Sequence, residues 1–361
     1  MARRPSVNSL RRRANKFLRL KGWLDLARHW RVDPVRMAVM AEEPKYRRYR
    51  IPKKTAGTFR QIEDPEPHLK ALLRKLNRDL QAVYYFQRSP AAYGFLVNPT
   101  DDPDPRNILS NAQRHLGCDW LMNLDMRDFF HLIDREDVEK LFRMAPFNFP
   151  KLTARRLGGL CTYEGRLPMG APTSPILSNY YSHPLDVQLE KYAASKEWTY
   201  TRFADDITFS SRQTPIFYED LYRINDWVEN FDLALNPTKS VIHGPDRNDK
   251  EVTGLVVGDT QVHLSAEFLE KVRTGIKQLD AVINTKYLMP SGRRKTTAWV
   301  KEVEQRVRGL VQFAQKVLPD DDPLQVELEN DFEEALEPPR RYGPVSWLEF
   351  GYLNFSEHLP D

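Results

Sequence analysis

Apolar residues recur at three-and-four spacing along much of the chain, which predicts amphipathic helices. The clearest stripe lies in residues 67–84, where Leu69, Leu73, Leu76 and Leu80 share one side. Further helices are predicted at residues 9–30, 33–41, from a cap at Asp134, at 175–190 with a break near Pro184, and at 218–231. From Ser265 onward, two long amphipathic helices indicate a separate helical lobe.

Segments rich in alternating, β-branched and aromatic residues predict strands at 46–52, 121–126, 198–203, 207–210, 240–243 and 251–257. Two of these strands flank Phe203-Ala204-Asp205-Asp206. The tetrapeptide is therefore predicted to turn a hairpin that carries two carboxylates at its tip. Taken alone, a solvated Asp-Asp turn is the simpler interpretation of this motif.

The composition indicates a globular protein of two to three domains, or one large multi-lobed enzyme. No apolar run is long enough to span a bilayer, and the basic N-terminal segment lacks the apolar core of a signal peptide, so we expect a cytoplasmic protein without a membrane partner. Cys118 and Cys161 are too few for a disulfide framework or a closed zinc site, and both are expected to be reduced.

The net charge of +4 conceals a strong segregation of charge along the chain. Basic residues crowd the start, at Arg3, Arg4, Arg11, Arg12, Arg13, Lys16, Arg19 and Lys21, whereas acidic residues dominate after Pro319. A basic arm can neutralise phosphates by releasing counterions, while an acidic tail is suited to contact protein or the basic surface of the chain itself. The simpler alternatives are a solvated face for the arm and a disordered segment for the tail.

Phosphoryl transfer with two metal ions needs carboxylates from separate segments around cations about 4 Å apart. Asp125 ends a predicted strand, so we expect it to join Asp205 and Asp206 as the metal-binding and catalytic residues, with Met126 as an adjoining metal-binding position. An aromatic residue shortly after Asp125 can form a floor under a nucleotide sugar. Phe130, five residues after Asp125, fits this role, and one of Phe129 and Phe130 is expected to be core.

Other candidates for nucleotide binding lie on loops and strand ends. The Pro- and Gly-rich loop of residues 166–175 can bring the backbone at Met169 and Gly170 close to a base pair. Cations suited to a triphosphate stand on neighbouring segments, at Lys53, Lys54, Arg60 and Lys239.

In order, these segments resemble the successive motifs of reverse transcriptases over about residues 46–318. Two further strings, Asn111-Ala-Gln-Arg-His115 and Val252-Thr253-Gly254, are similar to signatures of bacterial retron reverse transcriptases. The resemblance implies an α+β right-hand polymerase fold with an antiparallel palm sheet. It divides the chain into a basic helical region (1–45), fingers (46–120), palm (121–258, with 135–168 partly fingers), helical thumb (259–318) and acidic C-terminal tail (319–361).

The resemblance also implies roles for the candidate residues. The three aspartates would bind two Mg²⁺ ions, for which Mn²⁺ can substitute, and Phe130 would be the sugar gate. Lys53 or Lys54 would contact the incoming triphosphate together with Arg60, and Lys239 would donate a proton to pyrophosphate.

The implied partners are dNTPs and a cognate structured noncoding RNA that is both template and primer. DNA would start from a guanosine 2′-hydroxyl, giving a branched RNA–DNA molecule in an anti-phage system with an effector protein. Other bacterial reverse transcriptases, of the abortive-infection, diversity-generating or group II intron type, remain alternatives. So does an RNA-binding defence scaffold with a vestigial polymerase site.

Candidate RNA-binding residues are Asn111, His115, Val252, Thr253, Gly254, Arg293, Arg294 and Lys295. The 111–115 string is either an RNA-contacting or fingers-bracing element, or a helix end whose side chains satisfy backbone groups. The 252–254 string is either an RNA or primer grip, or a strand with a glycine bulge. The three cations at 293–295 contact RNA phosphates or lie in a solvated loop.

Two positions depart from the family pattern, which has Tyr at 203 and Gln at 169, where this chain has Phe and Met. Phe203 loses a hydrogen bond near the primer end but keeps its ring. Met169 lacks the amide that would hydrogen-bond to nucleotide or template, so we expect altered fidelity or nucleotide affinity.

Overall fold

The computed structural model describes residues 4–52, 57–288 and 293–337, except for the side chains of 285–288 and 293–297. The chain divides into two compact units, Met1–His263 and Leu264–Asp361. Within the described residues, no helix is long and apolar enough to cross a membrane. Lys53 and Lys54 lie outside the described residues.

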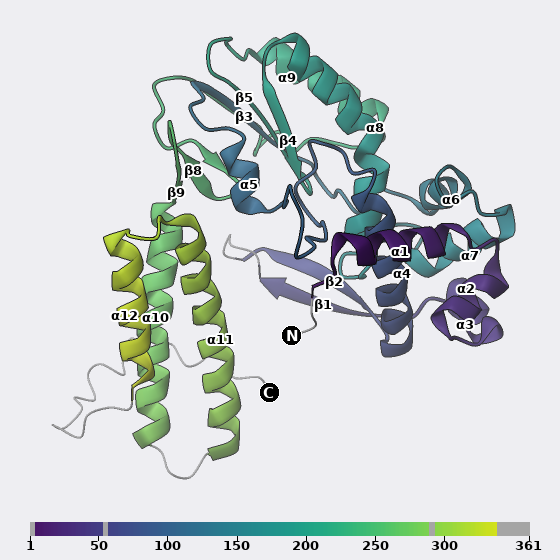
Figure 1. Cartoon of the computed structure of the whole chain (residues 1–361), viewed down its shortest axis with the longest axis horizontal. Coiled ribbons are helices and arrows are strands. Elements are labelled where there is room, and N and C mark those ends of the chain that lie inside the picture. Colours follow the sequence, from purple (N-terminus) through teal and green to yellow (C-terminus); the bar gives the residue numbers. More distant parts are fainter. Residues whose placement is uncertain (1–3, 53–56, 289–292, 338–361) are drawn as a thin grey trace. The chain divides into compact units, whose positions relative to one another are not determined.

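The first unit begins with three helices, α1 (Val7–Leu18), α2 (Trp23–Trp30) and α3 (Pro34–Glu42), and α1 packs against the long helix α4 (Pro67–Tyr85) (Figure 1). The prediction of one helix over residues 9–30 was wrong. The chain becomes extended at Gly22, the N-cap of α2, and this break lets Trp23 and Trp30 turn into the core.

A four-stranded antiparallel sheet forms the centre of the first unit, in the order β4-β5-β3-β6. Its strands are β3 (Trp120–Asp125), β4 (Thr199–Phe203), β5 (Asp206–Ser211) and β6 (Val241–His243). A separate hairpin joins β1 (Tyr46–Pro52) and β2 (Phe59–Pro65). The predicted α+β class with an antiparallel sheet is confirmed.

The third sheet contains β7 (Glu251–Val252), β8 (Leu255–Val257) and β9 (Val262–Leu264). The prediction of one strand over 251–257 was wrong, because Thr253 and Gly254 form a two-residue hairpin turn between β7 and β8. Both have positive φ, 51° and 82°, as a type I′ turn requires.

Five more helices complete the first unit: α5 (Ile108–Gln113), α6 (Arg135–Arg143), α7 (Lys151–Cys161), α8 (Ser174–Ser195) and α9 (Tyr218–Asn230). Helix α8 continues through Pro184, so the predicted break was wrong; buried residues such as Leu177 and Leu189 hold both halves of the helix.

Helix α7 was not predicted, because Gly158 and Gly159 weaken its helix propensity. A methyl group on Gly159 would lie 2.2 Å from the carbonyl oxygen of Ala41 in α3, so close packing requires glycine there.

The second unit is a bundle of α10 (Ala266–Leu288), α11 (Arg293–Val317) and α12 (Pro323–Leu336). Helix α12 lies within the segment predicted as an acidic tail. Asp322 caps it, and it buries Leu328, Phe332 and Ala335. The disordered-tail alternative is therefore wrong for this helix, whose apolar face packs on α10 and α11 while its carboxylates remain outside.

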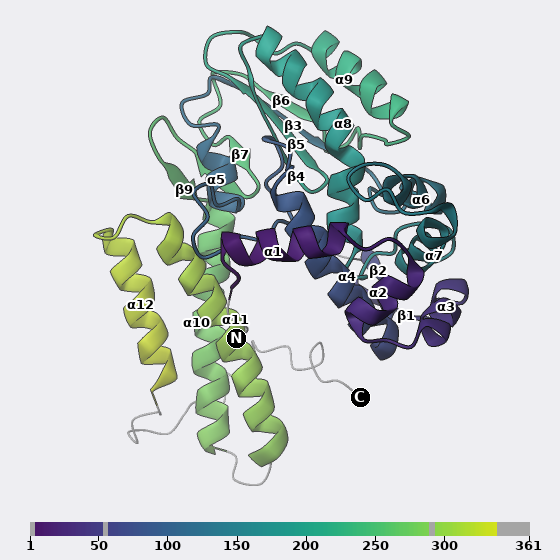
Figure 2. The same cartoon turned by 45° about the vertical axis from the view of Figure 1, so that its right-hand side comes forward.

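A buried ion pair ties α8 to the central sheet (Figure 2 shows α8 beside β4). Arg202 and Asp186 are both fully buried, and the guanidinium donates from Nε (2.7 Å) and from its second terminal nitrogen (2.8 Å) to the two carboxylate oxygens. Tyr200 donates to the same carboxylate. The other terminal nitrogen of Arg202 donates to Asn179 and to the carbonyl oxygen of Ala204, each at 3.0 Å.

Replacing Arg202 with Met is expected to lower the free energy of unfolding by about 3–5 kcal/mol, because Asp186 would remain buried without its cation. Urea unfolding followed by circular dichroism measures the loss. Arg155→Met, at an exposed position of α7, should change stability by no more than about 0.5 kcal/mol. A loss below about 1 kcal/mol for Arg202→Met would show that the pair does not organise the core.

Candidate active site

The hairpin between β4 and β5 places the two predicted carboxylates at its tip. Phe203 pairs with Asp206, and Ala204-Asp205 form the loop, with Ala204 at φ 61°. This position favours glycine, so the strain of Ala204 needs support from its surroundings. Arg202 holds the Ala204 carbonyl, and the backbone of Gly94 approaches so closely that a methyl group there would lie 2.6 Å from the Ala204 nitrogen.

The register of the sheet brings the three predicted aspartates together. Asp125, the last residue of β3, pairs directly with Asp206, the first residue of β5. The Met126 N–H donates to the carbonyl oxygen of Asp205 at 2.9 Å, which fixes the end of β3 against the hairpin tip. The side chain of Met126 is buried, so only its main chain is available to a metal.

Lys239 and Asn236 bind the Asp125 carboxylate from the segment before β6. Lys239 Nζ lies 2.8 Å from one oxygen and the Asn236 amide donates to the other at 3.2 Å, while the Asn236 N–H donates to the Asp125 carbonyl at 2.7 Å. The hydrogen bond to Asp125 raises the pKa of Lys239, which therefore carries a proton at neutral pH. Asn236 was missed as a site residue; its only signal was an Asn-Pro turn ahead of the predicted lysine.

The other two carboxyl groups, those of Asp205 and Asp206, lie where the ionised form is disfavoured. The surrounding protein and the charges of Asp205 and Asp125 raise the pKa of Asp206 to about 7, and partial desolvation raises that of Asp205, with a smaller lowering effect from Arg60. Asp206 is nevertheless exposed, and the neighbouring charges disfavour its ionised form in the same direction as desolvation does.

The chemistry of this donor set fits a hard divalent cation, which prefers carboxylate and carbonyl oxygens. Mutual repulsion among Asp125, Asp205 and Asp206 is the condition that a bound cation would relieve. As the side chains stand, no three His, Cys, Asp or Glu residues in the described ranges are positioned to share one ion. Cation binding would therefore need the carboxylate side chains to rotate toward one another.

The predicted nucleotide loop is fastened to the β1–β2 hairpin. Glu63 on β2 is buried and receives two hydrogen bonds of 2.9 Å from Arg166, and its N–H donates to the Met169 carbonyl at 2.7 Å. Gly170 has φ 132°, and a methyl group there would lie 2.8 Å from the Glu63 carbonyl oxygen. Burial alone would raise the pKa of Glu63, but hydrogen bonds and charge from Arg166 leave it below its ordinary value. Glu63 and Arg166 were not predicted.

Aromatic side chains follow Asp125 in the chain. Phe129 is buried in the core, as expected for one of the two phenylalanines, and Phe130 is only partly buried. The Phe130 ring lies 6.0 Å from that of Phe95 and 5.7 Å from that of Phe129. Phe130 is therefore partly accessible and packs against two other rings.

Two residues of the 111–115 string, Asn111 and His115, are buried, whereas Gln113 and Arg114 are exposed. Burial argues against direct RNA contact by the two predicted side chains, and the contacts of His115 favour the bracing interpretation. Asn111 and His115 are each 1% exposed. His115 bonds to Ser210 on β5 and Thr201 on β4, both at 2.7 Å. Burial and the charge of Arg114 lower the pKa of His115 to about 3, so the ring is neutral.

The other predicted RNA-binding positions are spread over the chain. Val252 is buried, while Thr253 is half-buried and Gly254 is exposed at the turn between β7 and β8, a hairpin that α5 contacts. Arg293, Arg294 and Lys295 open helix α11, and their side chains lie outside the described part of the chain.

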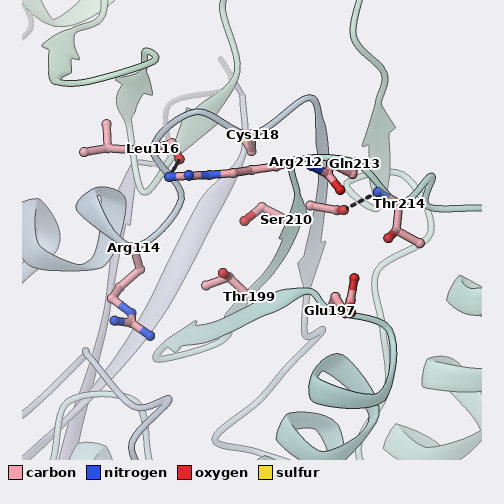
Figure 3. Close-up of a pocket in the computed structure, with 10 residues that line it drawn as sticks. Arg114, Leu116, Cys118, Glu197, Thr199, Ser210, Arg212, Gln213 and Thr214 are labelled. Carbon is pink, nitrogen blue, oxygen red and sulfur yellow. Dashed lines mark hydrogen bonds between the residues drawn. The ribbon is translucent and has the colours of Figure 1, made fainter.

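A hollow of about 290 Å³ opens at the opposite end of β4 and β5 from the aspartates. Figure 3 shows it lined by polar groups including Arg114, Thr199, Ser210 and Arg212, and Arg212 donates to the carbonyl of Leu116 at 3.1 Å. The hollow contains none of the predicted catalytic or nucleotide-binding residues.

In metal-free buffer, Asp206→Asn is expected to raise the melting temperature at pH 8. The pKa of Asp206 is raised on folding, so this carboxyl contributes stability below its unfolded pKa near 3.8 and loses it as pH rises through about 7. The advantage of the variant should therefore vanish as pH falls toward 4. Divalent metal should stabilise the wild type more than the variant. A lower melting temperature for metal-free Asp206→Asn at pH 8 would contradict the charge repulsion.

Residues 51–269 match the family model described as "Reverse transcriptase (RNA-dependent DNA polymerase)". Among curated proteins, the chain is 30% identical to the retron Ec86 reverse transcriptase of Escherichia coli, over 69% of this chain and 74% of that protein. It is 27% identical to the retron Ec83 reverse transcriptase of the same species, over 59% and 68%. The retron Mx162 reverse transcriptase of Myxococcus xanthus is 30% identical, over 69% and 54%.

Similar solved structures include a telomerase from Candida albicans (TM-score 0.43, 11% identity, 82% of this chain and 64% of that one) and a foamy viral protease–reverse transcriptase (0.40, 18%, 82% and 40%). The chain thus spans less than two thirds of the length of each of these two solved structures. The family model covers the hairpin of Asp205 and Asp206, the strand of Asp125 and the Glu63–Arg166 connection. The chain belongs to the reverse transcriptases, which are RNA-directed DNA polymerases, and its curated relatives place it among the bacterial retron enzymes.

Proposed function

We propose that the protein copies part of a cognate structured noncoding RNA into DNA, starting from a guanosine 2′-hydroxyl of that RNA. The product would be a branched RNA–DNA molecule, made in the cytoplasm as part of an anti-phage system with an effector protein. The convergence of Asp125, Asp205 and Asp206 at one end of the sheet is the observation that carries the catalytic part of this proposal. The retron relatives support the choice of RNA template and primer.

In this proposal, the three aspartates hold two Mg²⁺ ions, or Mn²⁺ in their place, with the Met126 main chain adjoining them. The ions would lower the pKa of the attacking hydroxyl and neutralise charge on the leaving pyrophosphate. Asp125 is positioned for this by Asn236, and the hairpin tip is positioned by Arg202. Lys239 stays protonated beside Asp125 and has a proton to give to pyrophosphate.

The nucleotide would lie between the β1–β2 hairpin and the aspartates. Arg60, exposed on β2, acts electrostatically on Asp205 and would bind the triphosphate, with Lys53 or Lys54 as further cations. Phe130 would contact the sugar and exclude a 2′-hydroxyl. Met169 and Gly170 would face the base pair through a loop whose position Glu63 fixes.

The cognate noncoding RNA, incubated with wild-type protein, Mg²⁺ and dNTPs, should yield DNA joined to a guanosine 2′-oxygen. Asp205→Asn should reduce this product at least about 100-fold, because one carboxylate of the metal site is lost. Denaturing gel analysis with and without ribonuclease measures it. Unbranched DNA from the wild type would favour another type of bacterial reverse transcriptase. Undiminished product from Asp205→Asn would refute the assigned site.

Glu63→Gln should raise the KM for dNTPs roughly tenfold, equivalent to about 1.4 kcal/mol, with kcat changed less than about twofold. The glutamine amide cannot accept both charge-assisted hydrogen bonds that Arg166 donates to the Glu63 carboxylate. The Met169–Gly170 loop would therefore shift on β2, while the aspartates would stay in place. Steady-state incorporation on a primed RNA template separates the two constants. The matched control is Glu139→Gln, which weakens the Arg135 pair on α6 away from the site. A loss confined to kcat would contradict a positioning role.

A further inference from the structure

The outer faces of α1 and α4 carry a concentration of positive charge that the polymerase site does not use. Figures 1 and 2 show α1 crossing α4, and the two helices are in contact. The exposed cations of the two packed helices, counting the residue that caps α1, are called here the α1–α4 basic face and are Arg11, Arg12, Lys16, Arg19, Arg74 and Arg78. On α4, Arg74 and Arg78 are one turn apart and share a face.

No carboxylate on these helices offsets that charge. Asp79 is the one acidic residue in either helix, and it is buried. It is already bound by Arg13 at 3.1 Å, by His29 at 3.0 Å and by the Trp30 indole at 2.8 Å. Among the described residues, none of the six cations of the basic face forms an ion pair with a carboxylate; Arg11 alone has a ring partner, with its guanidinium 4.6 Å from the centre of the Phe86 ring.

The basic face stands on packed helices, unlike the basic arm that the sequence suggested. Leu10, Ala14 and Phe17 bury the opposite side of α1, and the link from Arg13 to Asp79 holds α1 to α4. The helix backbone need not fold when these cations meet a phosphate backbone, so only their side chains lose freedom on binding.

A membrane surface does not fit this face equally well. Basic amphipathic helices bind membranes by inserting their apolar side. Here that side of α1 is already used inside the protein, where Phe17 packs edge-to-face on Phe147 and Phe149. Only the charged side remains available, which suits a water-soluble polyanion.

We propose that the α1–α4 basic face binds the phosphate backbone of structured RNA, at a site separate from the aspartates. The inference rests on the proposed function, since it adds a docking surface for the RNA that the enzyme copies. Binding there would be insensitive to sequence and would depend strongly on salt, because it works through counterion release. It would hold the RNA while the template is drawn through the polymerase site.

The test replaces Arg12, Lys16, Arg19 and Arg78 together with Gln and measures binding of a fluorescein-labelled RNA hairpin at several salt concentrations. Each lost phosphate contact lowers the slope of log K against log salt by about 0.7–0.9, so the slope should fall by roughly 3. Affinity at low salt should fall at least about tenfold. A second variant that changes only Arg12, Arg19 and Arg78 to Lys keeps the charge and should retain both the slope and the affinity.

The matched control removes the same charge elsewhere in the first unit, with Gln at the exposed positions Arg36, Arg143, Lys151 and Lys191. It should bind the hairpin within about twofold of wild type. An unchanged slope in the α1–α4 variant, or an equal loss in the control, would overturn the proposal. So would a loss of binding to phosphatidylserine vesicles without a loss of RNA binding.

Nucleotide incorporation on a short primed RNA template keeps this test separate from the proposed polymerase function. The α1–α4 variant should incorporate nucleotides at the wild-type rate when template is saturating. If neither the wild type nor the α1–α4 variant incorporates nucleotide, yet the salt slope is still lower for the variant, the polymerase proposal fails and the docking surface stands. If incorporation is normal and the slope is unchanged, the docking surface alone fails.

Discussion

The ion pair between Arg202 and Asp186 is the contact on which the geometry of the acidic hairpin depends. An arginine in the middle of a buried strand is costly unless its nitrogens find acceptors, and here Asp186, Asn179 and the Ala204 carbonyl accept hydrogen bonds from all three. The same guanidinium therefore links helix α8, strand β4 and the strained turn before Asp205. The turn can keep its positive φ because it is held from within the core.

The site built on that support is arranged around a charge imbalance. Asp125, Asp205 and Asp206 lie at one end of the sheet, and only Lys239 forms an ion pair with any of them in the described structure. Desolvation, together with that crowding, raises the pKa values of Asp205 and Asp206. Because a bound cation would relieve this repulsion, the three carboxylates favour cation binding, which metal-dependent phosphoryl transfer requires. The Glu63–Arg166 connection then sets the nucleotide loop against the neighbouring hairpin.

The sequence predicted what local patterns control. Apolar spacing placed α4 within one residue of its observed bounds, and the β-rich flanks of Phe203-Ala204-Asp205-Asp206 predicted the acidic hairpin. Prediction from the sequence failed where tertiary contacts determine whether a helix forms or continues. Pro184 does not break α8 because packing on both sides holds the helix, and α7 forms despite two glycines because close contact with α3 and α6 needs them.

The same limit applies to the site. The meeting of Asp125, Asp205 and Asp206 at one end of the sheet could be predicted because carboxylates at strand ends carry recognisable chemistry, and the motif order indicated the family. Arg202, Glu63 and Asn236 could not be identified, since a lone Arg, Glu or Asn in a sequence looks like surface until its buried partner is known. His115 shows the converse, a motif residue whose burial between β4 and β5 makes it a brace.

Templated incorporation of single nucleotides tests the central claim most directly. The wild-type protein is given an RNA template with an annealed DNA primer, divalent metal and one dNTP at a time, with each of the four template bases in turn. The account predicts extension by the complementary nucleotide in each case, and none when the metal is chelated. Absence of extension with every pair, or extension that ignores the template base, would contradict it.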